Sequence, residues 1–335
     1  MARSQLFDSN NTRVAQPVTT IAVLIPCYNE ELTVAEVVRQ FRAELPAAQI
    51  YVGDNNSTDR TVEKAREAGA QVLSEGRQGK GYVMQSMFRQ VEADIYVMVD
   101  GDGTYPPAEV HRLIEPVLDD RADMVVGSRL HDQSNSQFKP LNRFGNRFFL
   151  SVINRTFKVE ITDMLSGYRV LNRPFVKSLP LFGGGFEIET ELTIKALNRG
   201  YRVIEVPVNL TLRPQGSFSK IRIVNDGLRI LNTLLSLFRD YKPLTFFGAI
   251  GLLLIALGGA PAFVAIYEFI TKGLVRRMPL AVLAVGLFLS GMLSITVGLI
   301  LHTIVRRSQE FDYQLRVLSA EIIQKVQAEI RQVNK

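Results

Sequence analysis

The chain has 335 residues, a length typical of about two domains, and a formal net charge of +6. Its single cysteine, Cys27, excludes an internal disulfide framework and fits a reducing compartment. The first twenty residues lack the apolar core of a signal peptide, so we expect the domain that follows to be cytosolic. A net positive charge suits binding to nucleic acid, anionic lipid or phosphorylated ligands. Because long apolar runs crowd into the last third of the chain, we expect lipid headgroups and phosphates, and no nucleic acid.

Residues 1–18 are polar, and we expect them to form a flexible tail. After this tail, apolar runs typical of strands alternate with segments whose apolar residues have helical spacing. This alternation predicts an α/β fold with a mostly parallel sheet covered by helices. Ligands of such sheets bind at the carboxyl ends of the strands, where Asp54, Asp100 and Asp102 fall. The expected strands are residues 20–26, 49–54, 70–74, 94–100 and 123–129, and the expected helices are residues 30–45, 59–69, 79–91 and a segment from 107.

Two uncharged apolar runs lie at residues 244–267 and 278–305. Because about 20 apolar residues cross a bilayer as a helix, we predict a hairpin of two transmembrane helices, at about 244–269 and 279–305. Two buried helices of a soluble domain are the alternative. Two passes place both termini on one side, which we expect to be cytosolic. The cations that flank the hairpin support this orientation. The connecting loop favours the opposite orientation, because it carries Lys272, Arg276 and Arg277.

Amphipathic segments adjoin the predicted hairpin. Residues 216–242 are expected to form a helix in the headgroup layer, and residues 306–335 a cytosolic helix that can pair with another subunit. Residues 141–158 are also amphipathic and basic, with ordinary packing on the sheet as an equal alternative. The many small residues at 248–260 permit close helix approach, so we expect a homo-oligomer.

The stretch "VMVDGDGTYPP" places Asp100 and Asp102 one residue apart, with glycines beside them, at the end of a strand. Two such carboxylates suit a hard divalent cation, and Mg²⁺ commonly combines one or two carboxylates with substrate phosphates. An acidic turn after a strand is the simpler alternative. An EF-hand is a poor fit, because Thr104 and Tyr105 stand where it needs Asp or Asn and then Gly. Neither a G-x-G-x-x-G fingerprint nor a P-loop motif is present.

Several motifs occur in order: "IPCYNEE", "GDNNSTDRT", "GKGYVMQSM", "VMVDGDGTYPP" and "VGSR". Together they resemble the family 2 glycosyltransferases, which implies a GT-A fold over residues 19–215. The continuation "DMLSGYRVLNR", "FEIETELTIKALNRGYRVIEVPV" and "RPQGSFSK", followed by the hairpin, is similar to the polyprenyl-phosphate glycosyltransferases. These include dolichol-phosphate mannose and glucose synthases and undecaprenyl-phosphate glucosyltransferases of the GtrB type.

The resemblance implies a donor pocket with a metal site. Asp100 and Asp102 would hold Mg²⁺ or Mn²⁺ on the diphosphate, where the metal neutralises charge on the leaving group. Glu30 could instead charge a helix N-terminus, and Asp59 is equally suited to cap a helix. The family often has a second Asp where this chain has Asn55. The residues expected to bind the nucleotide sugar are Pro26, Tyr28, Glu30, Asp54, Lys80, Asp100 and Gly101.

The resemblance also implies a basic acceptor side, since arginine suits phosphate by its forked geometry. The second pKa of a phosphate monoester is about 6, so the nucleophile is already anionic and a general base is not strictly required. If a base exists, Asp163 matches the family motif, with Glu187 and Glu189 as alternatives. The expected acceptor-phosphate ligands are Arg129, Arg143, Arg213 and Ser219, and the expected catalytic residues are Asp102, Asp163 and Arg213.

The implied reaction is a single displacement that moves a hexose, with inversion, from a nucleotide-diphosphate sugar to a polyprenyl phosphate. The "GKG" at residues 79–81 favours UDP-glucose over GDP-mannose, and undecaprenyl and dolichyl phosphate both remain open as acceptors. A family 2 transferase with a non-phosphate lipid acceptor is an alternative, and a non-enzymatic membrane scaffold is a reading from another class. A processive polysaccharide synthase is disfavoured, because its Q-x-x-R-W signature needs tryptophan and the chain has none.

Overall fold

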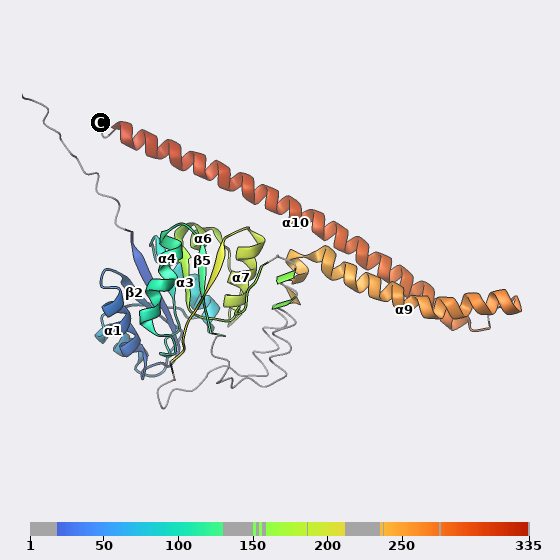
Figure 1. Cartoon of the computed structure of the whole chain (residues 1–335), viewed down its shortest axis with the longest axis horizontal. Coiled ribbons are helices and arrows are strands. Elements are labelled where there is room, and N and C mark those ends of the chain that lie inside the picture. The colour runs from blue at the N-terminus through green and yellow to red at the C-terminus, as the bar shows by residue number, and fades with distance from the viewer. Residues whose placement is uncertain are drawn as a thin grey trace, which may run out of the picture. The chain divides into compact units, whose positions relative to one another are not determined.

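The computed structural model describes residues 19–129, 150–151, 154–155, 159–185, 187–211, 235–236, 238–274 and 276–333. The chain divides into two compact units, Met1–Ile221 and Arg222–Lys335 (Figure 1). The tail predicted at residues 1–18, and most of the amphipathic segments predicted at 141–158 and 216–242, lie outside the described residues.

A seven-stranded sheet forms the centre of the first unit, in the order β3-β2-β1-β4-β6-β5-β7. All neighbouring strands are parallel except β6, which runs antiparallel to both β4 and β5. The predicted fold class, a mostly parallel sheet, is therefore confirmed, whereas strict alternation missed the reversed strand β6. The strands are β1 (Ile21–Cys27), β2 (Gln49–Asp54), β3 (Gln71–Ser74), β4 (Ile95–Met98), β5 (Met124–Ser128), β6 (Arg169–Asn172) and β7 (Val203–Pro207).

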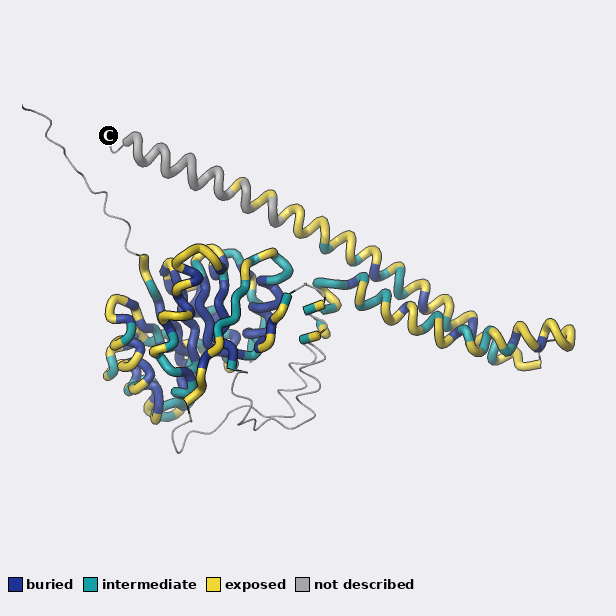
Figure 2. Tube along the Cα trace, viewed as in Figure 1, coloured by how far each residue is buried: buried dark blue, intermediate teal, exposed yellow. Residues whose placement is uncertain are grey.

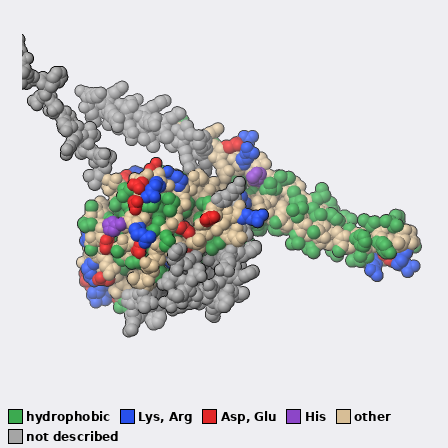
Figure 3. All heavy atoms as spheres, viewed as in Figure 1, with side chains coloured by type: hydrophobic (Ala, Val, Ile, Leu, Met, Phe, Trp, Pro, Cys, Tyr) green, Lys and Arg blue, Asp and Glu red, His purple; other side chains and the backbone are tan. Residues whose placement is uncertain are grey.

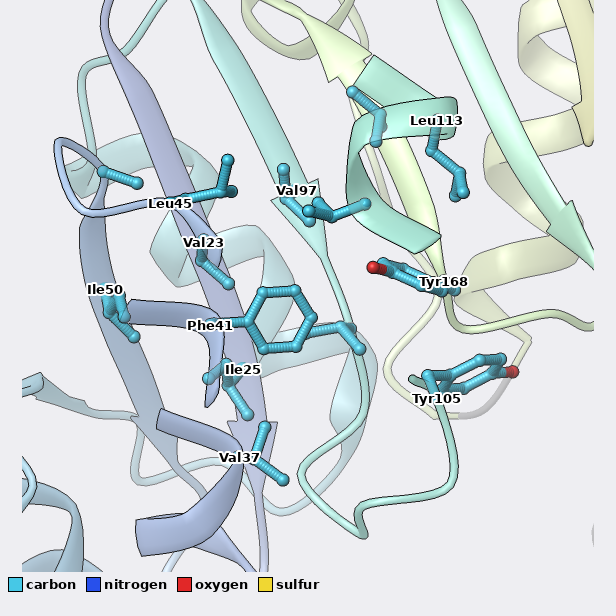
Figure 4. Packing of buried hydrophobic residues seen from close by; sticks show 14 of the residues in the cluster. Val23, Ile25, Val37, Phe41, Leu45, Ile50, Val97, Tyr105, Leu113 and Tyr168 are labelled. Atoms are coloured by element: carbon cyan, nitrogen blue, oxygen red, sulfur yellow. The ribbon is translucent and has the colours of Figure 1, made fainter. Parts of the chain in front are cut away.

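Helices cover both faces of the sheet because successive strand residues point to opposite sides. Val23 and Ile25 of β1 face α1 (Val34–Glu44), α2 (Thr61–Glu67) and α4 (Val110–Leu118), the last preceded by a 3₁₀ turn, Pro107–Glu109. Figure 4 shows this layer, where the ring of Phe41 meets that of Tyr168 edge to face, with ring centres 6.2 Å apart. Ala22 and Leu24 face α3 (Lys80–Gln90), α6 (Arg173–Ser178) and α7 (Ile188–Asn198). The sheet is thus buried between two helical layers, as Figure 2 shows, and Asp54, Asp100 and Asp102 lie at the ends of its strands.

The second unit is an antiparallel hairpin of α9 (Pro243–Lys272) and α10 (Met278–Val333). The two helices meet along small residues: a Cβ on Gly251 would lie 2.7 Å from the carbonyl oxygen of Gly291. The same seam continues at seven-residue spacing through Gly258 and Ala265 of α9, and through Ala284, Gly291 and Gly298 of α10. Ser294 donates a hydrogen bond to the carbonyl of Phe247 across it, at 2.8 Å.

The hairpin exposes apolar side chains away from this seam. Pro243–Lys272 and Met278–Phe311 are long and apolar enough to cross a membrane, with a mean hydropathy of 2.3 each. Figure 3 shows apolar side chains over the hairpin and cations at its tip, where Lys272, Arg276 and Arg277 are exposed. Helices that are apolar on all sides and yet little buried are typical of membrane spans. α10 also continues unbroken from the apolar segment to Val333.

Candidate functional site

The carboxyl ends of β1, β2 and β4 meet at one edge of the sheet. Asp54 ends β2 opposite Cys27 of β1 and accepts a hydrogen bond from the backbone N–H of Ser57 at 3.2 Å. Just beyond β4, Thr33 donates to the carbonyl of Gly101 at 2.7 Å. A Cβ on Gly101 would lie 2.5 Å from the Cys27 sulfur, so only glycine fits between the two acids. Asp100 and Asp102 are thereby brought beside the end of β1.

The carboxylate of Asp100 accepts a hydrogen bond from the ammonium group of Lys80, and the same ammonium group donates to Glu189. Lys80 begins α3, and Glu189 lies in the first turn of α7. Burial opposes the charge on Lys80, but the charges of Asp100 and Glu189 outweigh it and hold the pKa of Lys80 above its ordinary value. A Cβ on Gly167 would overlap the carboxylate of Asp100, so this acid is also packed closely against the chain before β6.

Asp102 is buried, and its Oδ1 accepts from the backbone N–H and hydroxyl of Thr104, at 3.0 and 2.7 Å. Among the described residues, no three acidic, histidine or cysteine side chains converge as metal ligands. The protein therefore supplies two carboxylates here, a set that suits Mg²⁺ or Mn²⁺ if diphosphate oxygens complete the coordination. The ammonium group on Asp100 shows that this position accepts positive charge.

Arg129 forms a forked ion pair with Asp163. Nε donates to Oδ2 at 2.7 Å, Nη2 donates to Oδ1 at 2.9 Å, and the backbone N–H of Arg129 donates to Oδ2 at 3.1 Å. Burial raises the pKa of Asp163, but its hydrogen bonds and the charge of Arg129 outweigh burial and hold that pKa below the ordinary value. A carboxylate in this state is a weak base and a strong anchor for the guanidinium group.

Arg169, which was not among the predicted site residues, supports the loop that carries Asp163. Arg169 is fully buried, and it donates to the carbonyls of Ser166 and Met164 at 2.9 and 2.7 Å. Its third partner is the hydroxyl of Thr193 in α7, at 2.8 Å. Arg169 lies within the family-like segment at residues 163–173, but nothing in the sequence shows what its side chain binds. Its partners, which give it a role, are visible only in the structure.

Asn55 fastens the segment that leads into α3. Its amide nitrogen donates to the carbonyls of Arg77 and Glu75 at 2.7 and 3.3 Å, and its oxygen accepts from the N–H of Gly79 at 2.6 Å. A carboxylate is only an acceptor when ionised and could not make the two donor bonds. Asn55 at this position is therefore suited to holding the chain rather than to binding a nucleotide base.

The glycines of "GKG" are required by packing. A Cβ on Gly79 or Gly81 would overlap the carbonyl oxygen of Gly184 or Gly183, respectively, and the N–H of Gly81 donates to Gly184 at 3.1 Å. The partner loop is held by Glu191, which accepts from the N–H of Gly183 at 2.7 Å. These glycines follow from close approach of two backbones, so they do not by themselves distinguish one donor sugar from another.

The remaining predicted donor residues lie around the same edge. Pro26 is in β1, the ring of Tyr28 is exposed just after it, and Glu30 accepts from the Thr33 hydroxyl at 3.3 Å. Asp59 accepts from the N–H groups of Thr61, the first residue of α2, and of Glu31, at 3.0 and 3.1 Å, so its carboxylate ties the start of α2 to the loop after β1.

Three predicted acceptor residues lie outside the described residues: Arg143, Arg213 and Ser219. The last described residue before the latter two is Thr211, whose N–H donates to the carbonyl of Thr104 at 2.9 Å. Thr211 therefore contacts the turn that contains Asp102, and Arg213 follows Thr211 by two residues in the sequence.

Comparisons with known proteins identify the family. The Glycosyl transferase family 2 profile matches residues 22–179. Glycosyltransferase AglJ of Haloferax volcanii is 32% identical over 295 residues, which cover 87% of this chain and 95% of AglJ. The dolichol-phosphate mannosyltransferase of Pyrococcus furiosus is 26% identical, and the match covers 69% of this chain and 68% of that protein. The dolichyl-phosphate hexose transferase of H. volcanii is 27% identical, and the match covers 56% of this chain and 81% of that protein.

Solved structures share the fold. Glucosyl-3-phosphoglycerate synthase of Mycobacterium tuberculosis, in complex with Mn²⁺ and UDP-glucose, superimposes with a TM-score of 0.55 at 23% identity. The match covers 66% of this chain and 79% of that enzyme. The predicted GT-A fold and the resemblance drawn from the sequence motifs are confirmed. The chain belongs to the family 2 glycosyltransferases.

Proposed function

We propose that the protein transfers a hexose from a nucleotide-diphosphate sugar to a polyprenyl phosphate at a membrane surface. One observation carries the proposal: the acid pair Asp100 and Asp102 lies on the same sheet edge as the Arg129–Asp163 fork. Burial lowers the pKa of Arg129, but the hydrogen bond to Asp163 and the charges of Tyr105, Asp163 and Asp100 outweigh burial and hold that pKa above its ordinary value, so Arg129 senses the charge of Asp100. A donor diphosphate on the acids and an acceptor phosphate on the arginine would then face each other.

On the donor side, Asp100 and Asp102 would hold Mg²⁺ or Mn²⁺, which supplies charge neutralisation for the leaving nucleoside diphosphate. Pro26, Tyr28, Glu30, Asp54, Lys80 and Gly101 would line the nucleotide-sugar pocket, because they surround the same strand ends. The Mn²⁺ and UDP-glucose bound by the M. tuberculosis enzyme support divalent-metal use on this fold.

On the acceptor side, Arg129 would bind the lipid phosphate, with Asp163 orienting the guanidinium group. Because the phosphate is already mostly anionic near neutral pH, positioning suffices and proton removal is not needed. The geometry therefore favours Asp163 as an orienting residue over the general base that it could be if the reaction used one. Arg143, Arg213 and Ser219 remain predicted acceptor contacts, with Arg213 and Asp102 as predicted catalytic residues.

The expected chemistry is a single in-line displacement at the anomeric carbon, so that an α-linked donor gives a β-linked polyprenyl-phosphate sugar. We propose UDP-glucose as the donor, and the UDP-glucose bound by the M. tuberculosis enzyme of the same fold supports this choice. GDP-mannose is the alternative, and the mannosyltransferase name of the P. furiosus relative supports it. The dolichyl-phosphate and dolichol-phosphate names of two relatives support a phosphate acceptor over a non-phosphate lipid.

The two apolar helices support a membrane location. We further propose that the catalytic unit and both termini face the cytosol and that the protein is a homo-oligomer. Fusion of a reporter to the loop between α9 and α10 tests the orientation, since that loop alone is expected on the opposite side.

A transfer assay tests the function. Purified full-length protein in detergent receives undecaprenyl or dolichyl phosphate, Mg²⁺ or Mn²⁺, and in turn UDP-glucose, UDP-galactose, UDP-N-acetylglucosamine and GDP-mannose. Metal-dependent transfer from one donor, abolished in Asp102→Asn, is the expected result. Absence of transfer from every donor to both lipids would overturn the lipid-phosphate assignment.

A further inference from the structure

Lys80 binds two carboxylates from distant parts of the chain. Its ammonium group contacts Asp100, just after β4, and Glu189, in the first turn of α7. The three residues are supplied by three different elements, so the triad exists only in the folded protein. Of the two acids, only Asp100 belongs to the proposed metal pair.

The two contacts differ in exposure. The side chain of Glu189 is 4% exposed and that of Lys80 is 10% exposed, whereas that of Asp100 is 29% exposed. The backbone of Glu189 is held in α7, where its carbonyl accepts a hydrogen bond from the hydroxyl of Thr193 at 3.0 Å, and that hydroxyl accepts one from buried Arg169 at 2.8 Å. The lysine therefore has one buried, fixed partner and one partner that is open to a ligand.

We propose that Lys80 is an exchangeable counter-ion of Asp100 and that Glu189 is the residue that positions it. Before the donor binds, the ammonium group neutralises Asp100. When the donor binds with its divalent cation, Lys80 releases Asp100, keeps Glu189, and donates to an oxygen of the diphosphate. This inference rests on the proposed function, because it deepens the role of the same donor site.

Electrostatics supports the exchange. An ammonium group and a divalent cation that share one carboxylate repel each other strongly at contact distance, even with protein screening. Lysine carries three rotatable donors on a compact charge, so it can retain one acceptor while it exchanges another. A phosphate oxygen of the incoming donor replaces the lost carboxylate and keeps the buried charge paired.

The exchange makes an unusual prediction for a basic residue near a metal site. Removing the positive charge with Lys80→Met should tighten Mn²⁺ binding in the absence of nucleotide, by about tenfold or more, because a competing cation is lost. The same change should weaken binding of UDP and GDP in saturating Mn²⁺, because a diphosphate donor is lost. Glu189→Gln should weaken Mn²⁺ binding several-fold, since Lys80 then has Asp100 as its only charged partner.

The experiment measures Mn²⁺ binding to full-length protein in detergent from the electron paramagnetic resonance signal of free Mn²⁺, with nucleotide binding by calorimetry. Lys80→Arg keeps the charge and should bind Mn²⁺ as the wild type does. Lys64→Met is the matched control, because Lys64 lies on α2 and pairs only loosely with Glu67, at 3.5 Å. Circular dichroism checks that each variant is folded.

Unchanged or weaker Mn²⁺ binding by folded Lys80→Met overturns the exchange and leaves Lys80 as a fixed structural ion pair. If Lys80→Met does not fold, Glu189→Gln decides: weaker Mn²⁺ binding supports the exchange, and unchanged binding refutes it. Neither measurement uses a lipid or a sugar. Opposite shifts of Mn²⁺ and nucleotide affinity without any lipid transfer would therefore refute the acceptor assignment while the exchange stands.

Discussion

The guanidinium group of Arg129 donates to both carboxylate oxygens of Asp163, at 2.7 and 2.9 Å. Asp163→Asn removes the charge and one of the two acceptors, so Arg129 loses its fixed orientation. A lost hydrogen bond between charged groups costs about 1.5–3 kcal/mol. We expect the KM for polyprenyl phosphate to rise roughly tenfold to a hundredfold. The KM for the donor should stay nearly unchanged. Steady-state kinetics with each substrate varied in turn measures both, and an effect confined to the donor KM would contradict the assignment.

The same ion pair predicts a pH dependence of stability. Because the pKa of Asp163 is lower in the folded protein than the unfolded value of about 3.9, the pair stabilises the fold above that value. This stability is lost as the pH falls through the folded pKa. The thermal midpoint of the wild type should therefore exceed that of Asp163→Asn by a constant amount between about pH 5 and 8. The difference should shrink at more acidic pH, and a difference that instead changes between pH 5 and 8 would argue against an ionised Asp163.

Asn55→Asp introduces the residue that the family often has at this position, and we expect it to be harmful here. The amide donors to the carbonyls of Arg77 and Glu75 are lost, and a carboxylate would face those oxygens instead. Unsatisfied buried groups cost about 1–3 kcal/mol each. The thermal midpoint should fall, and the donor KM should rise because the segment before Lys80 is loosened. Asn56→Asp is the comparison: it loses an exposed amide bond to the carbonyl of Gly76, at 2.9 Å, and should have the smaller effect, so equal effects of the two changes would refute a special role for Asn55.

Gly81→Ala tests the contact between α3 and the loop at residues 183–185. Alanine normally favours a helix over glycine by about 1 kcal/mol. Here its Cβ would overlap the carbonyl of Gly183, and overpacking costs about 1–3 kcal/mol. We expect a lower thermal midpoint and weaker donor binding. Gly76→Ala is the matched control, because a Cβ there meets nothing within 4 Å, and a stable Gly81→Ala variant would show that the loop moves freely.

Gly251→Ala tests the seam of the hairpin. The added Cβ would lie 2.6 Å from Ile295 Cγ1 and 2.7 Å from the carbonyl of Gly291, so the helices must separate. Close packing is a main attraction between helices in a membrane, so the thermal midpoint in detergent should fall. Gly259→Ala on the same helix has open space and should have little effect. Equal midpoints for the two variants would indicate that the helices do not pack in this register.

Several features could be predicted because they depend on local patterns. The apolar run before Asp100 and the glycine between Asp100 and Asp102 predicted a strand end with two acids, and β4 ends at Met98, just before them. Strand β6 could not be predicted in the same way, because residues 169–172 contain only two apolar residues and so short a segment carries no information about its direction. Its antiparallel pairing with β4 and β5 depends on contacts between distant segments.

The candidate site shows the same division. Asp54, Asp100 and Asp102 stood out because they fall at the ends of apolar runs, and Arg129 stood out through the motif that resembles the family. Arg169 did not, because a charged residue within an apolar pattern has no visible partner in the sequence. The role of Asn55 could not be predicted either, because only the structure shows that its side chain binds three backbone groups of the segment before α3.

The sequence by itself determined the family, the alternation of strands and helices, the acids at the strand ends and the two apolar helices, because all of these are written in residue types and spacings along the chain. The tertiary structure decided which cation meets which carboxylate. Lys80, Asp100 and Glu189 are separated by 20 and 89 residues, and Arg129 and Asp163 by 34. Folding brings these groups to one sheet edge, and Coulomb interactions at contact distance then set their pairing.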